Sequence, residues 1–468
     1  MPNEHKAAIQ LPKNKKNMVI WGSICLMLSI AMFGLSLATL QQPILEEMNA
    51  ANYFSLLSIF GTLGLSIMTP IGGKLGDLFG RRNLIIISGI ICAVCGIGMG
   101  FIRQILPFMF LRLLLGAAQG AFTSAPYILM REINDAKDVP KAMGLLASAV
   151  AFGGFGGSII AGFLTDRGWL EAAIIFPVIP LLLGIFLIAF ALPNHRRSGK
   201  VLIDVKGILT LAVGLSGILL ALNLGARIGW GNIWILSGFL LGIISLIILI
   251  KIEKNAKEPL IPLHLFKNRK YNLLLLIGFL CFFYNTAMNY YAPLAVLQIL
   301  GQNTTISGAL QFPRTILTIA LPTLCGIWVS KNSKNIYLSM LGSVILVGTA
   351  FLILSFTNTK TSVLIYFIML ALTGIAESLR SVSITPAAQA TLSPQDLGVG
   401  TALTSFANSL SNLFASVIFG LVYDMQLASN PSNLENIISG INSVFLTASV
   451  VTFVGILPIL AFARSKKQ

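Results

Sequence analysis

The sequence predicts an all-α protein that spans a lipid bilayer fourteen times. Hydrophobic residues account for 56% of the 468 residues, charged residues account for only 10%, and the mean hydropathy is +0.85. About a quarter of the residues of soluble proteins are charged, so this composition excludes a soluble globular fold. Long apolar runs and a one-sided distribution of basic residues complete the prediction.

Each apolar run has about 20 residues, the length that a helix needs to cross a hydrocarbon core of roughly 30 Å. The first run is too long for a cleavable signal peptide and lacks a small-residue cleavage site, so we expect it to remain as a spanning helix. The fourteen runs are residues 18–42, 50–73, 83–102, 105–129, 142–165, 170–192, 205–224, 231–251, 272–296, 305–329, 336–356, 361–384, 397–422 and 439–462.

Basic residues predict that both termini lie in the cytoplasm. With that orientation, 25 of the 32 Lys and Arg residues fall in cytoplasmic segments and four fall in outer loops, as the positive-inside rule requires. The net charge of +16 then reflects topology over anionic lipid, and no nucleic-acid partner is expected. Short loops and tails suit a bacterial inner or plasma membrane. The other basic residues fall within the runs and are Arg112, Arg314 and Arg380.

Motifs of several other functional classes are missing. The phosphate-binding pattern G-x-x-x-x-G-K-[ST] does not occur, so a built-in ATPase is not expected. The three histidines lack the spacing of a metal site, and we expect no metal and no cofactor. No nucleophile, base and orienting residue can be assembled from the motifs, so an enzyme is not expected. Cys92 and Cys95 are interpreted as two small apolar residues one helical turn apart.

Three pairs of segments resemble each other across the chain and indicate an internal repeat. They are residues 162–166 and 420–424, residues 116–126 and 374–386, and residues 73–83 and 326–335. Together they predict two pseudo-symmetric six-helix bundles with an inserted helix pair between them. The predicted segments are a cytoplasmic tail (1–17), a first bundle (18–192), the inserted pair (193–251), a cytoplasmic linker (252–271), a second bundle (272–462) and a tail (463–468). The linker segment "KEPLIPLHLF" is either an amphipathic connector on the bilayer surface or a simple linker.

The stretch "GGKLGDLFGRRN", residues 72–83, places charges among glycines between two apolar runs. The glycines, among them Gly73 and Gly80, predict a tight cytoplasmic turn and close helix approach, and Arg81 and Arg82 anchor the turn at the inner leaflet. The carboxylate of Asp77 needs a partner near the membrane edge, either a helix N-terminus or an arginine of a neighbouring helix. It therefore acts either as a conformational latch or as a simple cap of the next helix.

"GKLGDLFGRR" closely resembles the loop signature G-x-L-[AG]-D-[RK]-x-G-R-[RK] of the Major Facilitator Superfamily and departs from it at Leu78. "RLLLGAAQG", residues 112–120, resembles the fourth-helix motif of the same family, and fourteen spans with an inserted pair resemble its drug:proton antiporter branch. The resemblance implies multidrug efflux by alternating access, driven by the proton gradient, in a protein that functions as a monomer. It also implies a latch that stabilises the outward-open state and consists of Gly73, Asp77, Gly80, Arg81 and Arg82.

Two other signatures of that branch are altered in this chain. The first helix usually carries an acid near D-x-T-x-x-N-x-A-L-P, where Gly34 takes the place of the acid and Thr39 that of the asparagine. The fifth-helix motif G-P-x-x-G-G has Ser158 in place of its proline. These departures bear on the usual proton coupling and on the direction of transport.

Glu377 is the one acid that we place clearly within the hydrocarbon region. An ionised residue at that depth costs roughly 2.5 to 3.5 kcal/mol, so such residues are usually paired or functional. Arg380 follows three positions later and hence lies on the same helical face. Glu377 and Arg380 are either a self-neutralising pair or a proton-coupling site in which Glu377 exchanges its proton for cargo or for Arg380.

In the family that the chain resembles, the first and fourth helices of each bundle line a central cavity; here they are the first, fourth, ninth and twelfth runs. All four carry unusual polarity. Gln119 aligns with Glu377 in the repeat, and Arg112 is expected to tune or relay the proton, as the family's fourth-helix arginine does. Tyr284, Met288 and Tyr291 form a stripe that either packs against core or lipid or wraps a bulky ligand. The candidate cavity residues are Thr39, Gln41, Gln42, Gln119, Thr123, Tyr284, Asn285, Met288, Asn289 and Tyr291.

Three functions remain open from the sequence. The first is a proton-driven exporter of hydrophobic or amphipathic small molecules, with Glu377 as the leading proton carrier. The second is an organic-anion carrier, because three buried arginines face one glutamate and the first-helix acid is missing. The third is a membrane sensor or scaffold that transports nothing.

Overall fold

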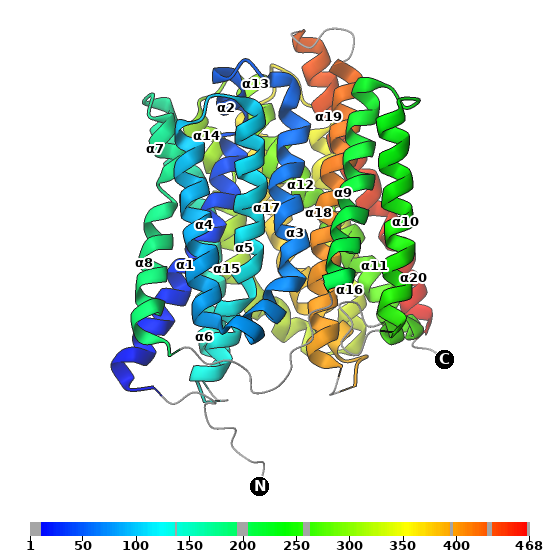
Figure 1. Ribbon diagram of the computed structural model, residues 1–468. Helices are drawn as coiled ribbons and strands as arrows, with labels where there is room; N and C mark the ends of the chain where they lie inside the picture. Colours follow the sequence, from blue (N-terminus) through cyan, green and yellow to red (C-terminus); the bar gives the residue numbers. More distant parts are fainter. Residues whose placement is uncertain are drawn as a thin grey trace. The chain divides into compact units, whose positions relative to one another are not determined.

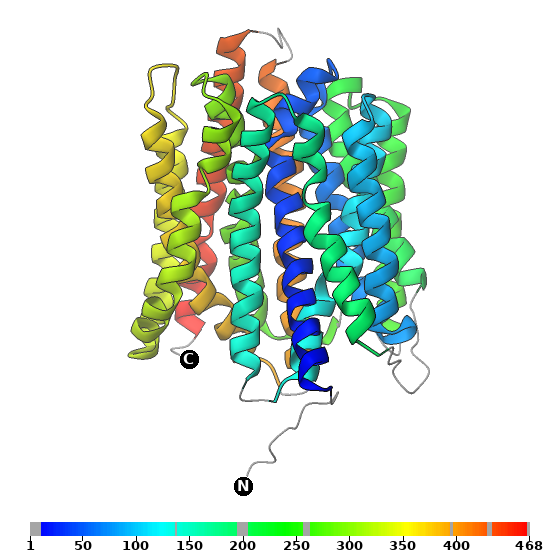
Figure 2. The same ribbon diagram turned by 90° about the vertical axis from the view of Figure 1, so that its left-hand side faces the viewer.

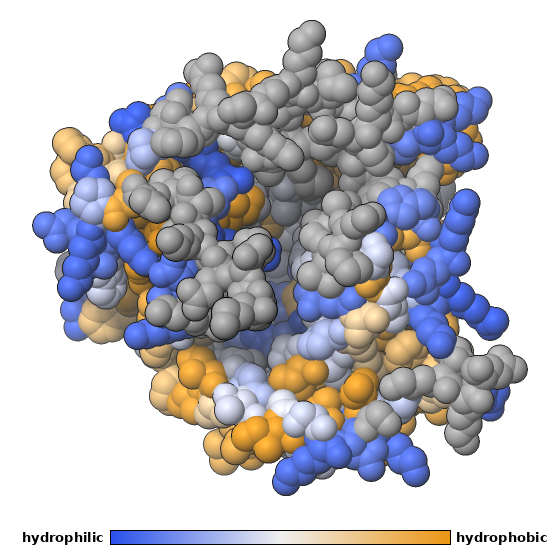
Figure 3. All heavy atoms as spheres, turned by 90° about the horizontal axis from the view of Figure 1, so that it is seen from below, coloured by the Kyte–Doolittle hydropathy of each residue, from blue (hydrophilic) through white to orange (hydrophobic). Residues whose placement is uncertain are grey.

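The computed structural model describes residues 11–135, 138–193, 205–255, 263–393, 396–427 and 433–465. These residues form helices and no strands (Figure 1). Within them, fourteen helical stretches are long and apolar enough to cross a membrane, so the predicted all-α fold with fourteen spans is confirmed. Hydrophilic side chains are numerous on the face at which the first helix begins (Figure 3).

The chain divides into two compact units. The first unit is Met1–Ala51 with Phe60–Ile203, and the second is Asn52–Ile59 with Asp204–Gln468. The inserted helix pair, expected as a segment of its own, groups with the second unit, and so does the beginning of α3. Each unit is therefore described by itself.

The helices of the first unit follow the predicted runs, with short additional helices at the loops. Within this unit α1 lies between α6 and α8 (Figure 2). The elements are α1 (Lys13–Thr39), α2 (Gln41–Glu47), η1 (Ala51–Tyr53), α3 (Phe54–Phe79), α4 (Arg81–Phe101), α5 (Ile105–Ile133), α6 (Val139–Asp166), α7 (Leu170–Ile175) and α8 (Val178–Ala191), of which η1 and the start of α3 group with the second unit.

The second unit begins with the inserted pair α9 and α10, which lie side by side (Figure 1). Helix α9 also packs against α18. The elements are α9 (Val205–Ile228), α10 (Ile233–Asn255), η2 (Leu263–Lys267), α11 (Arg269–Phe282), α12 (Tyr284–Thr286), η3 (Ala287–Tyr291), α13 (Ala292–Gln298), α14 (Thr304–Ala309), α15 (Phe312–Ser330), α16 (Ser333–Leu354), α17 (Val363–Gln389), α18 (Leu397–Leu427), α19 (Leu434–Val454) and α20 (Ile456–Ser465).

The ninth run is one continuous helical stretch that changes its hydrogen-bond register. Residues Ala287–Tyr291 form a π-helical turn between α12 and α13. Pro293 has no backbone N–H, so the carbonyl four residues earlier loses its usual helical donor, and a wider turn accommodates this loss. The π turn rotates the side chains before it relative to those after it. A constant number of residues per helical turn, as is assumed when residues are assigned to one face from the sequence, therefore does not hold across the π turn.

The predicted cytoplasmic turn lies at Gly80, because α3 continues as a helix from Phe54 to Phe79. Gly80 adopts a positive φ of 86°, and the chain turns there into α4. A residue with a Cβ is strained at that angle, which explains a glycine at this position. Gly72 has another use: its missing side chain lets α3 approach the carbonyl group of Ala121 in α5.

The linker between α10 and α11 is described only at its end. Residues 256–262, which hold much of the predicted amphipathic connector, lie outside the described residues. The following turn, η2, contacts the loop after α17: His264 Nε2 lies 2.9 Å from Asp396 Oδ1, and Asn268 donates to the carbonyl of Thr391 at 2.9 Å. Hydrogen bonds from Ser393 and His264 hold the pKa of Asp396 below its usual value.

Glycines bring the backbones of α1 and α6 into direct contact. A Cβ on Gly153 would lie 2.5 Å from the carbonyl oxygen of Leu28, and one on Gly157 would lie 2.7 Å from the Cα of Met32. Because backbone atoms cannot rotate out of the way, a side chain at either position must push the helices apart. Gly156, in the same helix, has no neighbour within 4 Å of the corresponding point.

The contrast between these glycines predicts opposite effects of one added methyl group. We expect Gly153→Ala to destabilise the protein by about 1 to 3 kcal/mol, because it overpacks the α1–α6 contact. Gly156→Ala is the matched control and should melt at or above the wild-type temperature, because alanine favours helix over glycine. Thermal unfolding of both variants in the same detergent checks this. Equal melting temperatures for the two variants would contradict the packing described.

Candidate functional site

An ion pair lies on α17 within the second unit. Arg380 Nε donates to Glu377 Oε2 at 2.9 Å, and Arg380 Nη2 donates to Glu377 Oε1 at 2.5 Å. The side chains are only 10% and 18% exposed, respectively. Two parallel N–H···O bonds between planar groups make the strongest geometry available to an arginine and a carboxylate. The predicted i, i+3 relation thus places both charges on one face and joins them.

Aromatic and polar groups from neighbouring helices enclose this pair. The Arg380 guanidinium lies over the ring of Phe282, 4.7 Å from its centroid, and the Tyr284 hydroxyl is 3.5 Å from Glu377 Oε2. Arg314 on α15 is close enough to interact electrostatically with Glu377. A gap too narrow to hold a water molecule borders the pair, lined among others by Cys281, Tyr284, Ser343 and Thr452. The cluster therefore carries two arginines and one glutamate.

Asn285 and Asn289 are partly exposed and hydrogen-bond to other helices of the same unit. Asn285 Nδ2 donates to Asn412 Oδ1 on α18, and Gln311 Nε2 donates to Asn289 Oδ1, both at 3.4 Å. Asn412 and Gln311 were not predicted from the sequence. The signal for Asn412 was present, because Asn408 and Asn412 stand one turn apart in a run without charged residues.

The predicted stripe of Tyr284, Met288 and Tyr291 is core packing in this structure. These side chains are 1%, 0% and 0% exposed. Tyr284 packs against Phe351, Met288 lies 3.6 Å from the Thr373 hydroxyl, and Tyr291 contacts an aromatic group that includes Phe419. Met288 and Tyr291 are thus buried among side chains in this structure, and Tyr284 borders the narrow gap beside Glu377.

In the first unit, Thr39 and Ser158 form a hydrogen bond between α1 and α6. Their hydroxyl oxygens are 2.6 Å apart, and the residues are 3% and 1% exposed. In this structure Thr39, predicted to line a cavity, is a helix-contact residue between α1 and α6. The reason is that α6 approaches α1 closely at its glycines, so a hydroxyl at this contact meets another hydroxyl.

Gln41 and Gln42 lie beyond the end of α1, in the short helix α2. Gln41 is fully buried, and Gln42 Nε2 donates to Glu46 Oε1 at 2.8 Å on the exposed side of α2. In this structure neither residue belongs to α1, because the α-helical pattern of α1 ends at Thr39 and α2 begins at Gln41.

Helix α5 carries three predicted site residues on its length. Arg112 is 3% exposed, and its Nε would be 3.0 Å from a Cβ on Gly61, so the guanidinium lies directly against α3. Gln119 is 6% exposed, lies beside Cys92, and has an amide nitrogen without a hydrogen-bond partner in the described part of the chain. Thr123 is partly buried and donates to the carbonyl of Gln119 at 2.6 Å.

The predicted latch is described in part. The surroundings of Gly73 and of the Asp77 side chain lie outside what the structure describes. Arg81 forms an ion pair with Glu132 at the end of α5, and Arg82 Nε donates to the carbonyl of Ala189 at 2.9 Å near the end of α8. The two arginines thus tie the beginning of α4 to α5 and to α8.

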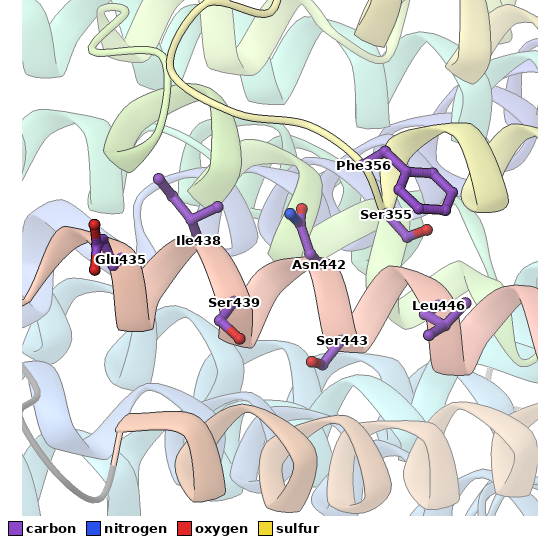
Figure 4. Close-up of a pocket in the computed structure, with 8 residues that line it drawn as sticks. All are labelled: Ser355, Phe356, Glu435, Ile438, Ser439, Asn442, Ser443 and Leu446. Carbon is purple, nitrogen blue, oxygen red and sulfur yellow. The ribbon is translucent and has the colours of Figure 1, made fainter.

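A larger hollow of about 460 Å³ lies elsewhere in the second unit (Figure 4). Its only charged lining residue is Glu435, and the amide of Asn442 is occupied by hydrogen bonds with Thr357. None of the predicted site residues lines it. The lining consists of one face of α19 and the end of α16, namely Ser355, Phe356, Glu435, Ile438, Ser439, Asn442, Ser443 and Leu446.

Comparison with known families decides the class of protein. A sequence model of the Major Facilitator Superfamily matches residues 22–416. The chain belongs to the Major Facilitator Superfamily. Membership identifies it as a multi-pass membrane transporter of a small-molecule substrate. The resemblance based on the loop motif and on fourteen spans is therefore confirmed.

Relatives within the superfamily include characterised bacterial transporters. The multidrug transporter protein MdtP of Bacillus subtilis is 28% identical over 417 residues, which cover 88% of this chain and 76% of that protein. The multidrug efflux pump SdrM of Staphylococcus aureus is 25% identical, over 88% of this chain and 90% of that protein. A solved bacterial homologue of the human lysosomal transporter Spinster has a TM-score of 0.69 at 13% identity, over 97% of this chain and 98% of that one, which shows a shared fold.

The Thr39–Ser158 contact joins two positions at which this superfamily member departs from the antiporter signatures. Thr39 stands where the first-helix signature has asparagine, and Ser158 where the fifth-helix signature has proline. The two hydroxyls satisfy each other's hydrogen bonding inside an apolar contact. We infer that the two departures compensate for each other, since either hydroxyl alone would be buried without this partner.

A double-mutant cycle tests this compensation. Thr39→Val and Ser158→Ala should each destabilise by about 1 to 3 kcal/mol, because each leaves one buried hydroxyl without its partner. The double variant removes both hydroxyls and should be less destabilised than the sum of the single variants. Melting temperatures of the four proteins give the coupling. Strictly additive effects would show that the hydroxyls do not depend on each other.

Proposed function

We propose that the chain is a proton-coupled exporter of hydrophobic or amphipathic compounds, of the multidrug type, in the cell membrane. The names of the relatives MdtP and SdrM support both the cargo class and, for SdrM, the outward direction. The asymmetry of the basic residues supports cytoplasmic N- and C-termini. The proton gradient is proposed as the energy source, with no cofactor, and a monomer as the functional unit.

The observation that carries the coupling proposal is the buried bidentate pair of Glu377 and Arg380. A proton that binds to the Glu377 carboxylate forms an O–H bond there and removes the negative charge that Arg380 needs. Leaving one member of a buried ion pair uncompensated costs about 3 to 5 kcal/mol. A proton that moves through 100 mV supplies about 2.3 kcal/mol, so a membrane potential of ordinary size provides energy of this order.

The proposed transport cycle follows from the competition between a proton and Arg380 for the Glu377 carboxylate. When Glu377 is ionised, its negative charge compensates the positive charge of Arg380, and the two side chains form the ion pair observed in this structure. With Glu377 protonated, Arg380 requires another partner, which favours a rearrangement of α17 against its neighbours. Cargo and proton then stabilise different states, as antiport requires. Arg112 is proposed to tune the protonation step from the first unit.

The anion-carrier alternative has one observation in its favour. Arg314 lies near the pair and its Nε has no hydrogen-bond partner among the described residues, so the cluster has an excess positive charge when Glu377 is ionised. The pairing of Arg380 removes one of the three arginines on which that alternative rested. Transport of a permanent cation such as ethidium favours the exporter, whereas exclusive transport of anionic dyes favours the alternative.

Neutralising Glu377 tests the coupling. We expect Glu377→Gln to lose the dependence of cargo transport on an imposed pH gradient, because the amide cannot exchange a proton. Proteoliposomes that report dye movement and internal pH together provide the measurement. Glu435→Gln is the matched control, since Glu435 is an exposed glutamate of the same unit and should remain coupled. Undiminished coupling in Glu377→Gln would refute the assignment.

A further inference from the structure

Asn223 is an unusual residue in the inserted helix α9. It is 0% exposed, and neither its amide nitrogen nor its amide oxygen has a hydrogen-bond partner in the described part of the chain. A buried amide without partners destabilises the structure that contains it. In Asn272, Gln311 and Asn408 of this unit only the amide oxygen is buried without a partner, whereas in Asn223 both amide atoms are, and Asn442 is satisfied by Thr357. The amide of Asn223 therefore destabilises the observed conformation and would gain hydrogen bonds in a different one.

The neighbours of Asn223 are Gly420 of α18 and Ser55 at the beginning of α3. A Cβ on Gly420 of α18 would lie 3.0 Å from Asn223 Nδ2 and 2.7 Å from the Cβ of Ser55. Asn223 and Ser55 thus approach the same point on the backbone of α18, one from α9 and the other from the beginning of α3. Glycine at 420 permits this double approach, because any side chain there would displace one of them.

One turn further along the same face of α18 stands a carboxylate. Asp424 follows Gly420 by four residues, and Ser55 Oγ donates to Asp424 Oδ2 at 2.7 Å. Ser55 is fully buried and Asp424 partly buried. An ionised carboxylate in such a place needs strong donors at all times, and an amide N–H₂ supplies two. The amide of Asn223, which has no hydrogen-bond partner among the described residues, therefore lies about one turn of α18 from the Asp424 carboxylate, which can accept a hydrogen bond.

We propose that Asn223 is a positioning residue for transport that acts through Asp424. When the beginning of α3 withdraws from α18 during the transport cycle, the Asp424 carboxylate leaves the Ser55 hydroxyl and accepts hydrogen bonds from the Asn223 amide. The exchange replaces the hydroxyl donor by an amide donor and gives the inserted helix pair a part in the cycle. This inference rests on the proposed transport function, because it requires that α3 moves.

Asn223→Leu, which keeps the branching of the side chain and replaces the amide by two methyl groups, should change stability and transport in opposite directions. The variant should melt at a higher temperature than wild type, since an unsatisfied group is gone. It should also hold Ser55 on Asp424, so that residues 52–59 exchange amide hydrogens more slowly. Dye transport should fall several-fold in maximal rate with an unchanged KM, because cargo does not contact Asn223.

Controls separate this role from an ordinary structural one. Asn442→Leu removes a satisfied amide and should lower the melting temperature. In an Asp424→Asn background, Asn223→Leu should have no further effect on hydrogen exchange or transport if Asn223 acts through Asp424. Full effects in that background would overturn the proposal, as would a lower melting temperature or unchanged hydrogen exchange in Asn223→Leu itself. If the wild type moves no cargo, the proposed function fails, while melting and hydrogen exchange still decide the role of Asn223.

Discussion

Hydrocarbon offers no hydrogen bonds, so a polar side chain inside a membrane-spanning bundle is destabilising unless it has a partner within the bundle, and the candidate site follows from this constraint. Glu377 meets Arg380, Asn285 meets Asn412, and Thr39 meets Ser158. Each contact replaces the solvation that water would supply, at a cost of several kcal/mol if the partner is lost. A chain with 10% charged residues retains such groups where they hold helices together or respond to a proton or to cargo.

Close helix approach makes these contacts short. Glycines on α6 let the backbone of α1 come within van der Waals distance, and the same approach brings Thr39 to Ser158. In the second unit, Gly374 on α17 packs against the backbone of Arg314 on α15, which places the second arginine near Glu377. Small residues thus set the helix spacing, and the spacing sets which polar groups can meet. The small residues at the helix contacts therefore determine where the site residues lie.

Properties that depend on local sequence were predictable. The spans follow from hydropathy, and the Glu377–Arg380 contact follows from a separation of three residues on one helix. Properties that depend on how the helices pack against one another could not be predicted from the sequence. Helix α3 continues to Phe79, past the predicted end of the second run at residue 73. A π turn alters the face presented by Met288 and Tyr291, and Gln41 begins a separate short helix, α2. The pairing of Thr39 with Ser158 joins residues 119 positions apart, which no local pattern encodes.

The central claim is that proton and cargo compete through the Glu377 carboxylate. Equilibrium binding of ethidium, whose charge does not titrate, measures this competition in detergent without any gradient or transport step. The account predicts that the affinity of the wild type falls as the pH falls, because protonation of Glu377 disfavours the cargo-binding state, and that the affinity of Glu377→Gln does not change with pH. The same pH dependence in both proteins would contradict it.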